Sequence, residues 1–126
     1  MITATSEEAR WLTRVSDGVH AIAADTTPDK GGAAAGLRPH DLLEAALAAC
    51  TNMTVRFVAA EHGLPLTGVE TRVTLDRSDP ERAVFRYEVA LEGPLDAAAR
   101  ARLLAAAERC PVRQTLGRKL EFVREA

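Results

Sequence analysis

The chain has 126 residues, 47% of them hydrophobic, and only two are cysteines. This length and composition predict a single globular domain over residues 1–126 that folds without disulfides. A net charge of −2 at pH 7 argues against non-specific nucleic-acid binding, which needs a surplus of basic residues. Because no apolar run approaches the ~18 residues of a membrane span and the N-terminus lacks a signal-peptide pattern, we expect a soluble, cytoplasmic protein that binds no membrane.

Turns organise the first third of the chain. Residues 10–15 and 18–25 have the character of short strands and are separated by a Ser-Asp-Gly turn, so we predict a β-hairpin. Residues 26–37 contain a proline and three glycines, a composition that indicates a flexible connection. The glycine spacing does not match a phosphate-binding loop.

A long amphipathic α-helix is predicted over residues 39–62, because apolar residues recur there at three- and four-residue steps. Pro39 suits the first helical position, and Gly63 and Pro65 end the helix. A rod of roughly 36 Å is long for so small a domain, so we expect the other elements to wrap it. The apolar face is predicted to comprise Leu42, Leu43, Ala46, Leu47, Cys50, Met53, Thr54, Phe57 and Val58.

The next segments alternate apolar and polar side chains. Residues 66–77 and 83–91 show this alternation on either side of a Ser-Asp-Pro-Glu turn, which predicts an antiparallel hairpin. A Gly-Pro pair then ends the hairpin. Asp96 is a suitable N-cap for a second helix over residues 97–109.

The sequence pattern near the end of the chain predicts two short elements, a helix and a strand. Pro111 suits the first turn of a new helix, which would run over residues 111–117 and end at a glycine. Residues 119–124 alternate again and predict a terminal strand.

The two cysteines differ in their local setting. A thiol with an ordinary pKa is only a few per cent thiolate at pH 7, so a working nucleophile needs a nearby cation or helix N-terminus. Cys50 lies in the middle of the long helix on an apolar face, which favours a packing role. Cys110 precedes Pro111 at a helix N-terminus, and Arg113 adds positive charge, so local reasoning favours Cys110 as the thiolate.

The joint occurrence of Cys50 and Cys110 on elements that face the core predicts a nucleophile and its resolving partner. Such a pair reduces a peroxide through a sulfenic acid and then a disulfide. His20 and His62 have no ligand spacing, so we expect no metal site and no cofactor. Which polar residues assist Cys50 is left open among His40, Asp41, Glu44, Arg10, Arg14 and Arg38.

Three segments carry a resemblance to a known family. PHDLL at 39–43, AALAACT at 45–51 and ERCPV at 108–112 together resemble the OsmC/Ohr family, named for osmotically inducible protein C and organic hydroperoxide resistance protein. Residues 16–19 and 26–32 are also similar. The resemblance implies an α+β, OsmC-like fold in which antiparallel β-hairpins wrap the long helix. It also implies an intertwined homodimer with its active sites at the subunit interface.

The resemblance assigns roles to the two thiols. In the characterised peroxidases of that family, the cysteine matching Cys50 attacks a small organic hydroperoxide and the one matching Cys110 resolves the sulfenic acid. A dithiol such as a lipoylated protein then reduces the disulfide. The resemblance thus selects Cys50 where local reasoning favoured Cys110.

The helix start departs from those peroxidases, which carry a glutamate directly after the helix-opening proline. His40 stands there in this chain and Asp41 follows, an arrangement more similar to the less characterised OsmC-like (YhfA-type) branches. We predict a cysteine-based hydroperoxide reductase. The alternatives are a non-catalytic dimer that binds a small hydrophobic molecule, and a stress-associated structural dimer.

Overall fold

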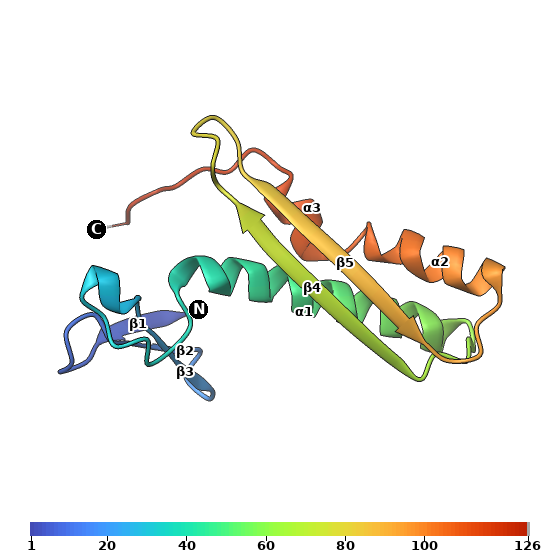
Figure 1. Cartoon of the computed structure of the whole chain (residues 1–126), viewed down its shortest axis with the longest axis horizontal. Helices are drawn as coiled ribbons and strands as arrows, with labels where there is room; N and C mark the ends of the chain where they lie inside the picture. Colours follow the sequence, from blue (N-terminus) through green and yellow to red (C-terminus); the bar gives the residue numbers. More distant parts are fainter. Residues whose placement is uncertain (126) are drawn as a thin grey trace. The chain divides into compact units, whose positions relative to one another are not determined.

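The computed structural model describes residues 1–125. The chain divides into two compact units, Met1–Leu43 and Glu44–Ala126. Figure 1 labels the helices and strands of both. The long helix and the antiparallel strands make this a mixed α+β protein, and the predicted fold class is confirmed.

The N-terminal unit is a three-stranded antiparallel sheet. Its strands are β1 (Thr3–Ser6), β2 (Thr13–Ser16) and β3 (Ala21–Ala24), in that order across the sheet. The predicted hairpin is present as β2 and β3, whose turn contains Gly18 with a positive φ of 99°. Strand β1 was not predicted, because its sequence TATS has no alternation of apolar and polar residues.

The segment between β3 and the long helix is built around a buried carboxylate. Asp25 is 5% exposed, and its carboxylate accepts N–H bonds from Thr26, Ala33 and Ala35. These bonds, with that from Ala35 the largest influence, hold the pKa of Asp25 below its ordinary value. A 3₁₀ turn, η1 (Pro28–Lys30), lies within the segment. The segment is the predicted connection apart from this one turn, and the Asp25 side chain satisfies three of its backbone donors.

Helix α1 (Pro39–Glu61) confirms the predicted long helix to within one residue of its end. Asp41 accepts the backbone N–H of Arg38 at 2.8 Å, which is one half of a capping box. At the other end Gly63 has a positive φ of 60°, which suits a residue that terminates a helix.

The buried face of α1 differs from the predicted one. The buried residues follow four-residue steps at Leu47, Thr51, Val55 and Ala59. Four members of the predicted apolar face are instead exposed: Ala46, Leu43 by 42%, Met53 by 50% and Phe57 by 73%. The helix is apolar around much of its circumference, so periodicity alone allowed two stripes and packing selected one of them.

The C-terminal unit packs α1 against a hairpin and a second helix. Strands β4 (Gly68–Asp76) and β5 (Val84–Glu92) form a two-stranded antiparallel sheet that runs along α1, with α2 (Ala97–Ala107) beside it (Figure 1). A short helix, α3 (Pro111–Leu116), follows α2. The core cluster consists of Val55, Ala59, Leu103 and Ala107, and β4 and β5 contribute partly buried apolar side chains such as Val69, Val89 and Leu91.

Polar contacts also join α1 to β4. The Thr71 hydroxyl donates to the carbonyl of Ala48 at 2.8 Å, and the Asn52 amide donates to the carbonyl of Val69 at 2.9 Å. By length and composition alone α1 could cross a bilayer. In this structure its buried stripe packs in the core of the C-terminal unit.

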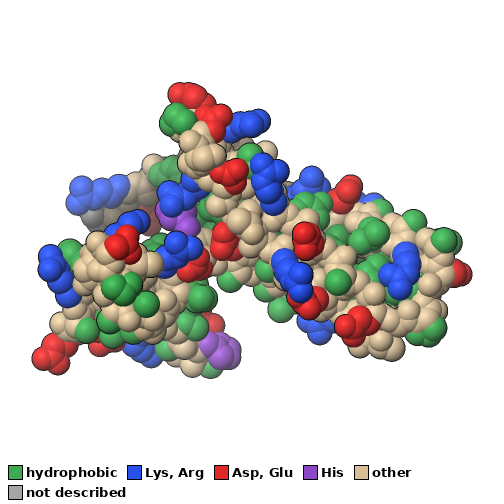
Figure 2. Space-filling view, in the orientation of Figure 1, with side chains coloured by type: hydrophobic (Ala, Val, Ile, Leu, Met, Phe, Trp, Pro, Cys, Tyr) green, Lys and Arg blue, Asp and Glu red, His purple; other side chains and the backbone are tan. Residues whose placement is uncertain are grey.

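The outer face of the hairpin is charged. Arg72 pairs with Glu70 and Glu88, and Arg86 pairs with Asp76. Basic and acidic side chains are interspersed on the face of the molecule shown in Figure 2. This mixture is typical of a solvated surface.

The prediction of a terminal strand over 119–124 was wrong. Residues 119–125 have no regular secondary structure, and Phe122 and Val123 are 92% and 81% exposed. A strand requires a neighbouring backbone, and within the described residues no strand pairs with this segment. Alternation alone was not sufficient to form the element.

The core position of Leu103 gives a test of this packing. Leu103 is fully buried, so Leu103→Ala is expected to lower the free energy of unfolding by about 2–5 kcal/mol. Leu104, the next residue, is 44% exposed and is the matched control, with an expected loss below about 1 kcal/mol for Leu104→Ala. Urea denaturation followed by circular dichroism measures both. Equal losses for the two variants would contradict the assigned core.

Candidate active site

The junction between α2 and α3 fixes the position of Cys110. Pro111 begins α3, where a missing N–H costs no helical hydrogen bond, and Cys110 is the N-cap in an extended conformation. Its sulfur accepts the backbone N–H of Arg113 at 3.3 Å. The side chain is fully buried. Cys110 therefore has the helix N-terminal position that the sequence predicted.

The side chain of Arg113 has a different role from the expected one. Its guanidinium donates to the backbone carbonyl of Glu108, the residue at the C-terminus of α2. It therefore closes the turn between the two helices. The contribution of Arg113 to the sulfur is its backbone N–H.

Helix α1 supplies the other half of the site. The side chains of Thr51 and Cys50 are among the groups that lower the pKa of the Cys110 thiol, which places both beside it. Both cysteines are free thiols, and Cys50 is half-buried whereas Thr51 is only 2% exposed. The two cysteines, remote in sequence, therefore lie in contact, and Cys50 is the more accessible of the two.

Opposing influences act on the charge of Cys110. Burial raises the pKa of its thiol, because desolvation disfavours a thiolate. The N–H of Arg113, the side chains of Thr51 and Cys50, and the N–H of Val112 stabilise the thiolate and together outweigh burial. The net result is a pKa below the ordinary value.

Thr51 was missed by sequence reasoning. It directly follows Cys50, and it is the polar member of the buried stripe of α1. A buried hydroxyl needs a hydrogen-bond partner, and among the described residues no buried side-chain N or O atom lacks one. A threonine at a core position next to a cysteine was the signal that could have identified it.

The two carboxylates proposed as helpers have partners of their own. Asp41 forms an ion pair with Arg38 at 2.6 Å, and the Arg38 side chain is the main cause of the lowered pKa of Asp41. Glu44 accepts the backbone N–H of Leu75 at 2.6 Å and so links α1 to β4. Both carboxylates therefore hold local structure together, Asp41 at the start of α1 and Glu44 between α1 and β4.

The remaining helper candidates belong to the N-terminal unit. The guanidinium of Arg10 lies 4.9 Å from the ring centroid of Trp11, in a cation–π contact. Arg14, on β2, and His40, in the first turn of α1, are exposed. That one of these residues, or Arg38, assists Cys50 stays a prediction.

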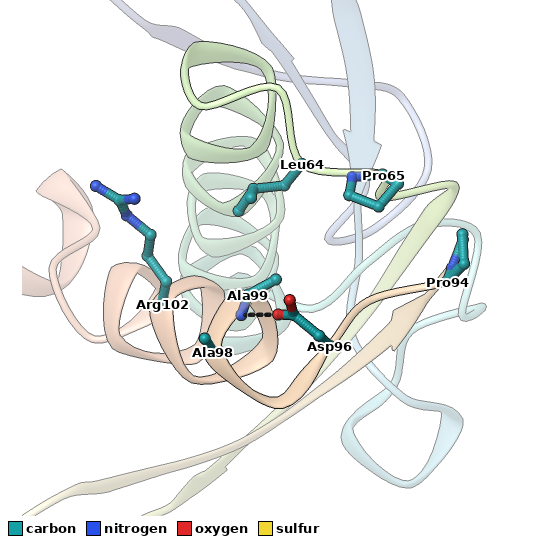
Figure 3. Close-up of a pocket in the computed structure, with 7 residues that line it drawn as sticks. All are labelled: Leu64, Pro65, Pro94, Asp96, Ala98, Ala99 and Arg102. Atoms are coloured by element: carbon teal, nitrogen blue, oxygen red, sulfur yellow. Dashed lines mark hydrogen bonds between the residues drawn. The ribbon is translucent and has the colours of Figure 1, made fainter.

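A pocket of about 300 Å³ lies at the opposite end of α2 from Cys110. Figure 3 shows Leu64, Pro65 and Pro94 facing the first turns of α2, where Asp96 accepts the N–H of Ala99. Neither cysteine lines this pocket. Over residues 1–125, no three His, Cys, Asp or Glu side chains gather as a metal site would require.

The protein has an α+β fold in which α1 places Cys50 beside Cys110, the N-cap of α3. The fold and the site together define a protein with a paired-thiol site. A family model described as OsmC-like protein matches residues 30–123, and the chain belongs to the OsmC-like family. The resemblance identified from the sequence is confirmed. No curated protein matches the chain.

Solved structures with the same fold come from several bacteria. An osmotic stress induced and detoxification response protein from Psychrobacter arcticus is 22% identical with a TM-score of 0.76, and the match covers 90% of this chain and 85% of that one. An OsmC-like protein from Mycoplasma pneumoniae is 23% identical, with a TM-score of 0.76 and coverages of 92% and 85%. The organic hydroperoxide resistance protein OhrB of Bacillus subtilis is 26% identical, with a TM-score of 0.58 and coverages of 93% and 89%.

The unequal burial of the two thiols predicts an order of modification. Iodoacetamide added to the native, reduced protein is expected to alkylate Cys50 before Cys110, because an alkylating agent must reach the sulfur. Peptide mapping by mass spectrometry at short times measures the order. After denaturation the two should react at similar rates, which is the control, and earlier labelling of Cys110 in the native protein would contradict the geometry.

Proposed function

We propose that the protein is a thiol-dependent peroxidase that reduces small organic hydroperoxides, with Cys50 as the nucleophile and Cys110 as the resolving cysteine. The observation that carries the proposal is the proximity of the two thiols: Cys50 is among the groups that lower the pKa of Cys110, and Cys50 is the more accessible of the two. Family membership supports it, since one solved relative is an organic hydroperoxide resistance protein.

The proposed reaction begins at Cys50. Its proton passes to the neighbouring Cys110 thiolate, and the Cys50 thiolate attacks the terminal oxygen of the hydroperoxide. The O–O bond breaks, and the alkoxide takes the proton that Cys110 accepted and leaves as an alcohol, so Cys110 is a thiolate again. Cys50 is thereby oxidised to a sulfenic acid, and the hydroperoxide is reduced.

Cys110 completes the oxidative half of the cycle. Its thiolate attacks the sulfur of the Cys50 sulfenic acid, an S–S bond forms, and hydroxide leaves and takes up a proton to become water. The backbone N–H of Arg113 holds the attacking sulfur in place. A dithiol, such as a lipoylated protein, then reduces the disulfide by thiol–disulfide exchange, and this cycle requires the reducing conditions of the cytoplasm.

A second copy of the chain is proposed to complete the protein as a homodimer. The face of α1 that carries Cys50 also carries Met53 and Phe57, which are half and three-quarters exposed in the single chain. Large apolar side chains that gather on one helix face indicate an interaction surface. A second copy covering this face would shelter Cys50 from bulk water.

The reaction is tested by following hydroperoxide consumption with dihydrolipoamide as the reductant. Cys50→Ser is expected to reduce the rate roughly a hundredfold or more, because no other group in the proposed cycle can form the sulfenic acid. Cys110→Ser is the matched variant. It is expected to allow a single turnover that leaves a trappable sulfenic acid on Cys50. Equal rates for the parent and Cys50→Ser would overturn the proposal and favour a binding or structural role.

The proposed dimer is tested by sedimentation equilibrium of a charged variant. Phe57→Glu places a carboxylate on the exposed apolar face and is expected to weaken association at least tenfold, because burial of an unpaired charge is unfavourable. Ala101→Glu adds the same charge to an exposed position of α2 and serves as the control. A monomeric parent protein, or equal effects of the two variants, would contradict the proposal.

A further inference from the structure

We propose that residues 119–124 of a second copy of the chain add to the β4–β5 hairpin as a third strand, antiparallel to β5, with Phe122 opposite Phe85. This inference deepens the homodimer of the proposed function and rests on it, because the second copy supplies the strand. It does not depend on the peroxidase chemistry.

The outer edge of β4 is covered by α1. The backbone N–H of Leu75 donates to the Glu44 carboxylate at 2.6 Å. The carbonyl of Val69 accepts the Asn52 amide at 2.9 Å. In an antiparallel strand every second residue directs its N–H and C=O to the same side. This edge of the hairpin is therefore closed by side chains of the same chain near both of its ends.

The outer edge of β5 is open. Leu75 is opposite Phe85, so the residues of β5 whose backbone groups point away from β4 alternate from Phe85 onward. They are Phe85, Tyr87, Val89 and Leu91. The Leu91 carbonyl accepts the guanidinium of Arg100 at 3.5 Å. Within residues 1–125, no hydrogen bond uses the outward backbone groups of the other three. Such an edge is a template for another strand.

A hollow of about 680 Å³ lies along this open edge. It is lined by residues 84–88 of β5, together with Arg72 and Thr74 of β4. Consecutive residues of a strand point to opposite faces, so the hollow borders both faces of the edge. Phe85 and Tyr87 are half-buried there in the single chain. A third strand beside β5 would fill this space.

Residues 119–124 have the properties of the missing strand. Phe122 and Val123 are 92% and 81% exposed, which is unusual for large apolar side chains without a partner. Lys119 and Glu121 form an ion pair at 3.6 Å, as side chains two residues apart do on an extended backbone. In Figure 1 this segment extends away from α3 and does not run along β5 of its own chain. A second copy is therefore the source of the strand.

The apolar and charged side chains select one register. With Phe122 opposite Phe85, Leu120 is opposite Tyr87, and both pairs lie on the inner face of the hairpin. The pairs on the outer face are then Lys119 with Glu88, Glu121 with Arg86, and Val123 with Val84. Opposite charges across strands are favourable and like charges are unfavourable.

Other registers are unfavourable. A shift by two residues in one direction places Glu121 opposite Glu88, and a shift in the other direction places Lys119 opposite Arg86. A shift by one residue moves Phe122 to the charged outer face. The charge pattern of β5 therefore matches residues 119–124 in the proposed alignment.

Disulfide cross-linking tests this register. Val84→Cys and Val123→Cys are combined in a Cys50→Ser, Cys110→Ser background, and the protein is oxidised mildly. The proposal makes positions 84 and 123 a non-hydrogen-bonded pair with Cα atoms about 4.5 Å apart, within disulfide range. A covalent dimer is expected on a non-reducing gel, with the two peptides linked in mass spectrometry. Ala90→Cys combined with Val123→Cys is the matched control, because Ala90 is exposed further along β5, and it is expected to stay unlinked.

Sedimentation equilibrium in the parent background provides a second measurement that keeps both native thiols. Phe122→Glu is expected to fold, since Phe122 is exposed in the single chain, and to weaken association at least tenfold, because the carboxylate would be buried against Phe85. Val19→Glu adds the same charge at a position that is 86% exposed in the N-terminal unit, and its association is expected to match that of the parent.

Several outcomes would overturn the inference. They are a disulfide within one chain, equal linking of the two cysteine pairs, association of Phe122→Glu equal to that of the parent, and a monomeric parent. If Phe57→Glu dissociates the dimer and Phe122→Glu does not, the added strand is wrong and the homodimer of the proposed function stands. No hydroperoxide is used, so these results are also separate from the proposed peroxidase activity.

Discussion

The contacts around the Cys110 sulfur are the interaction on which the site depends. The backbone N–H of Arg113 in α3 donates to this sulfur, and the side chains of Thr51 and Cys50 in α1 lie near enough to lower its pKa. They require three things of the sequence: a proline that starts α3 directly after the cysteine, a buried threonine, and a second cysteine beside that threonine. Each feature has an ordinary structural explanation alone, and only their convergence on one atom indicates chemistry.

The two faces of α1 serve different purposes. The stripe that contains Leu47, Val55 and Ala59 packs against the hairpin and α2, which fixes the helix in the C-terminal unit. Two hydrogen bonds also join the helix to β4: Asn52 donates to the carbonyl of Val69, and Thr71 donates to the carbonyl of Ala48. A fixed helix is a requirement for a thiol pair, because a disulfide tolerates only a narrow range of separations.

Much of the architecture was predictable from local pattern. The bounds of α1, the β4–β5 hairpin and the two C-terminal helices follow from periodicity, proline and glycine positions, and the N-cap at Asp96. The face of α1 was not predictable, since Phe57 and Val55 are equally apolar and only tertiary contacts distinguish them. The prediction of a strand over 119–124 was wrong for the same reason. Alternation of apolar and polar residues is typical of a strand, but a strand also needs a neighbouring backbone to pair with.

The site was predictable in part. The two thiols could be paired from their number and their position on core-facing elements, and the helix cap at Cys110 was evident from Pro111. The role of Glu44 depends on atoms that folding brings close, so no spacing in the sequence reveals it. The same holds for Arg113, whose side chain turns away from the sulfur to the carbonyl of Glu108.

Disulfide mapping after a stoichiometric oxidation tests the central claim most directly. The reduced protein is treated with one equivalent of cumene hydroperoxide, blocked with an alkylating agent and digested for mass spectrometry. The account predicts an intrachain link between the peptide that contains Cys50 and the one that contains Cys110. Recovery of both cysteines as alkylated thiols, or of Cys50 over-oxidised with Cys110 still free, would contradict it.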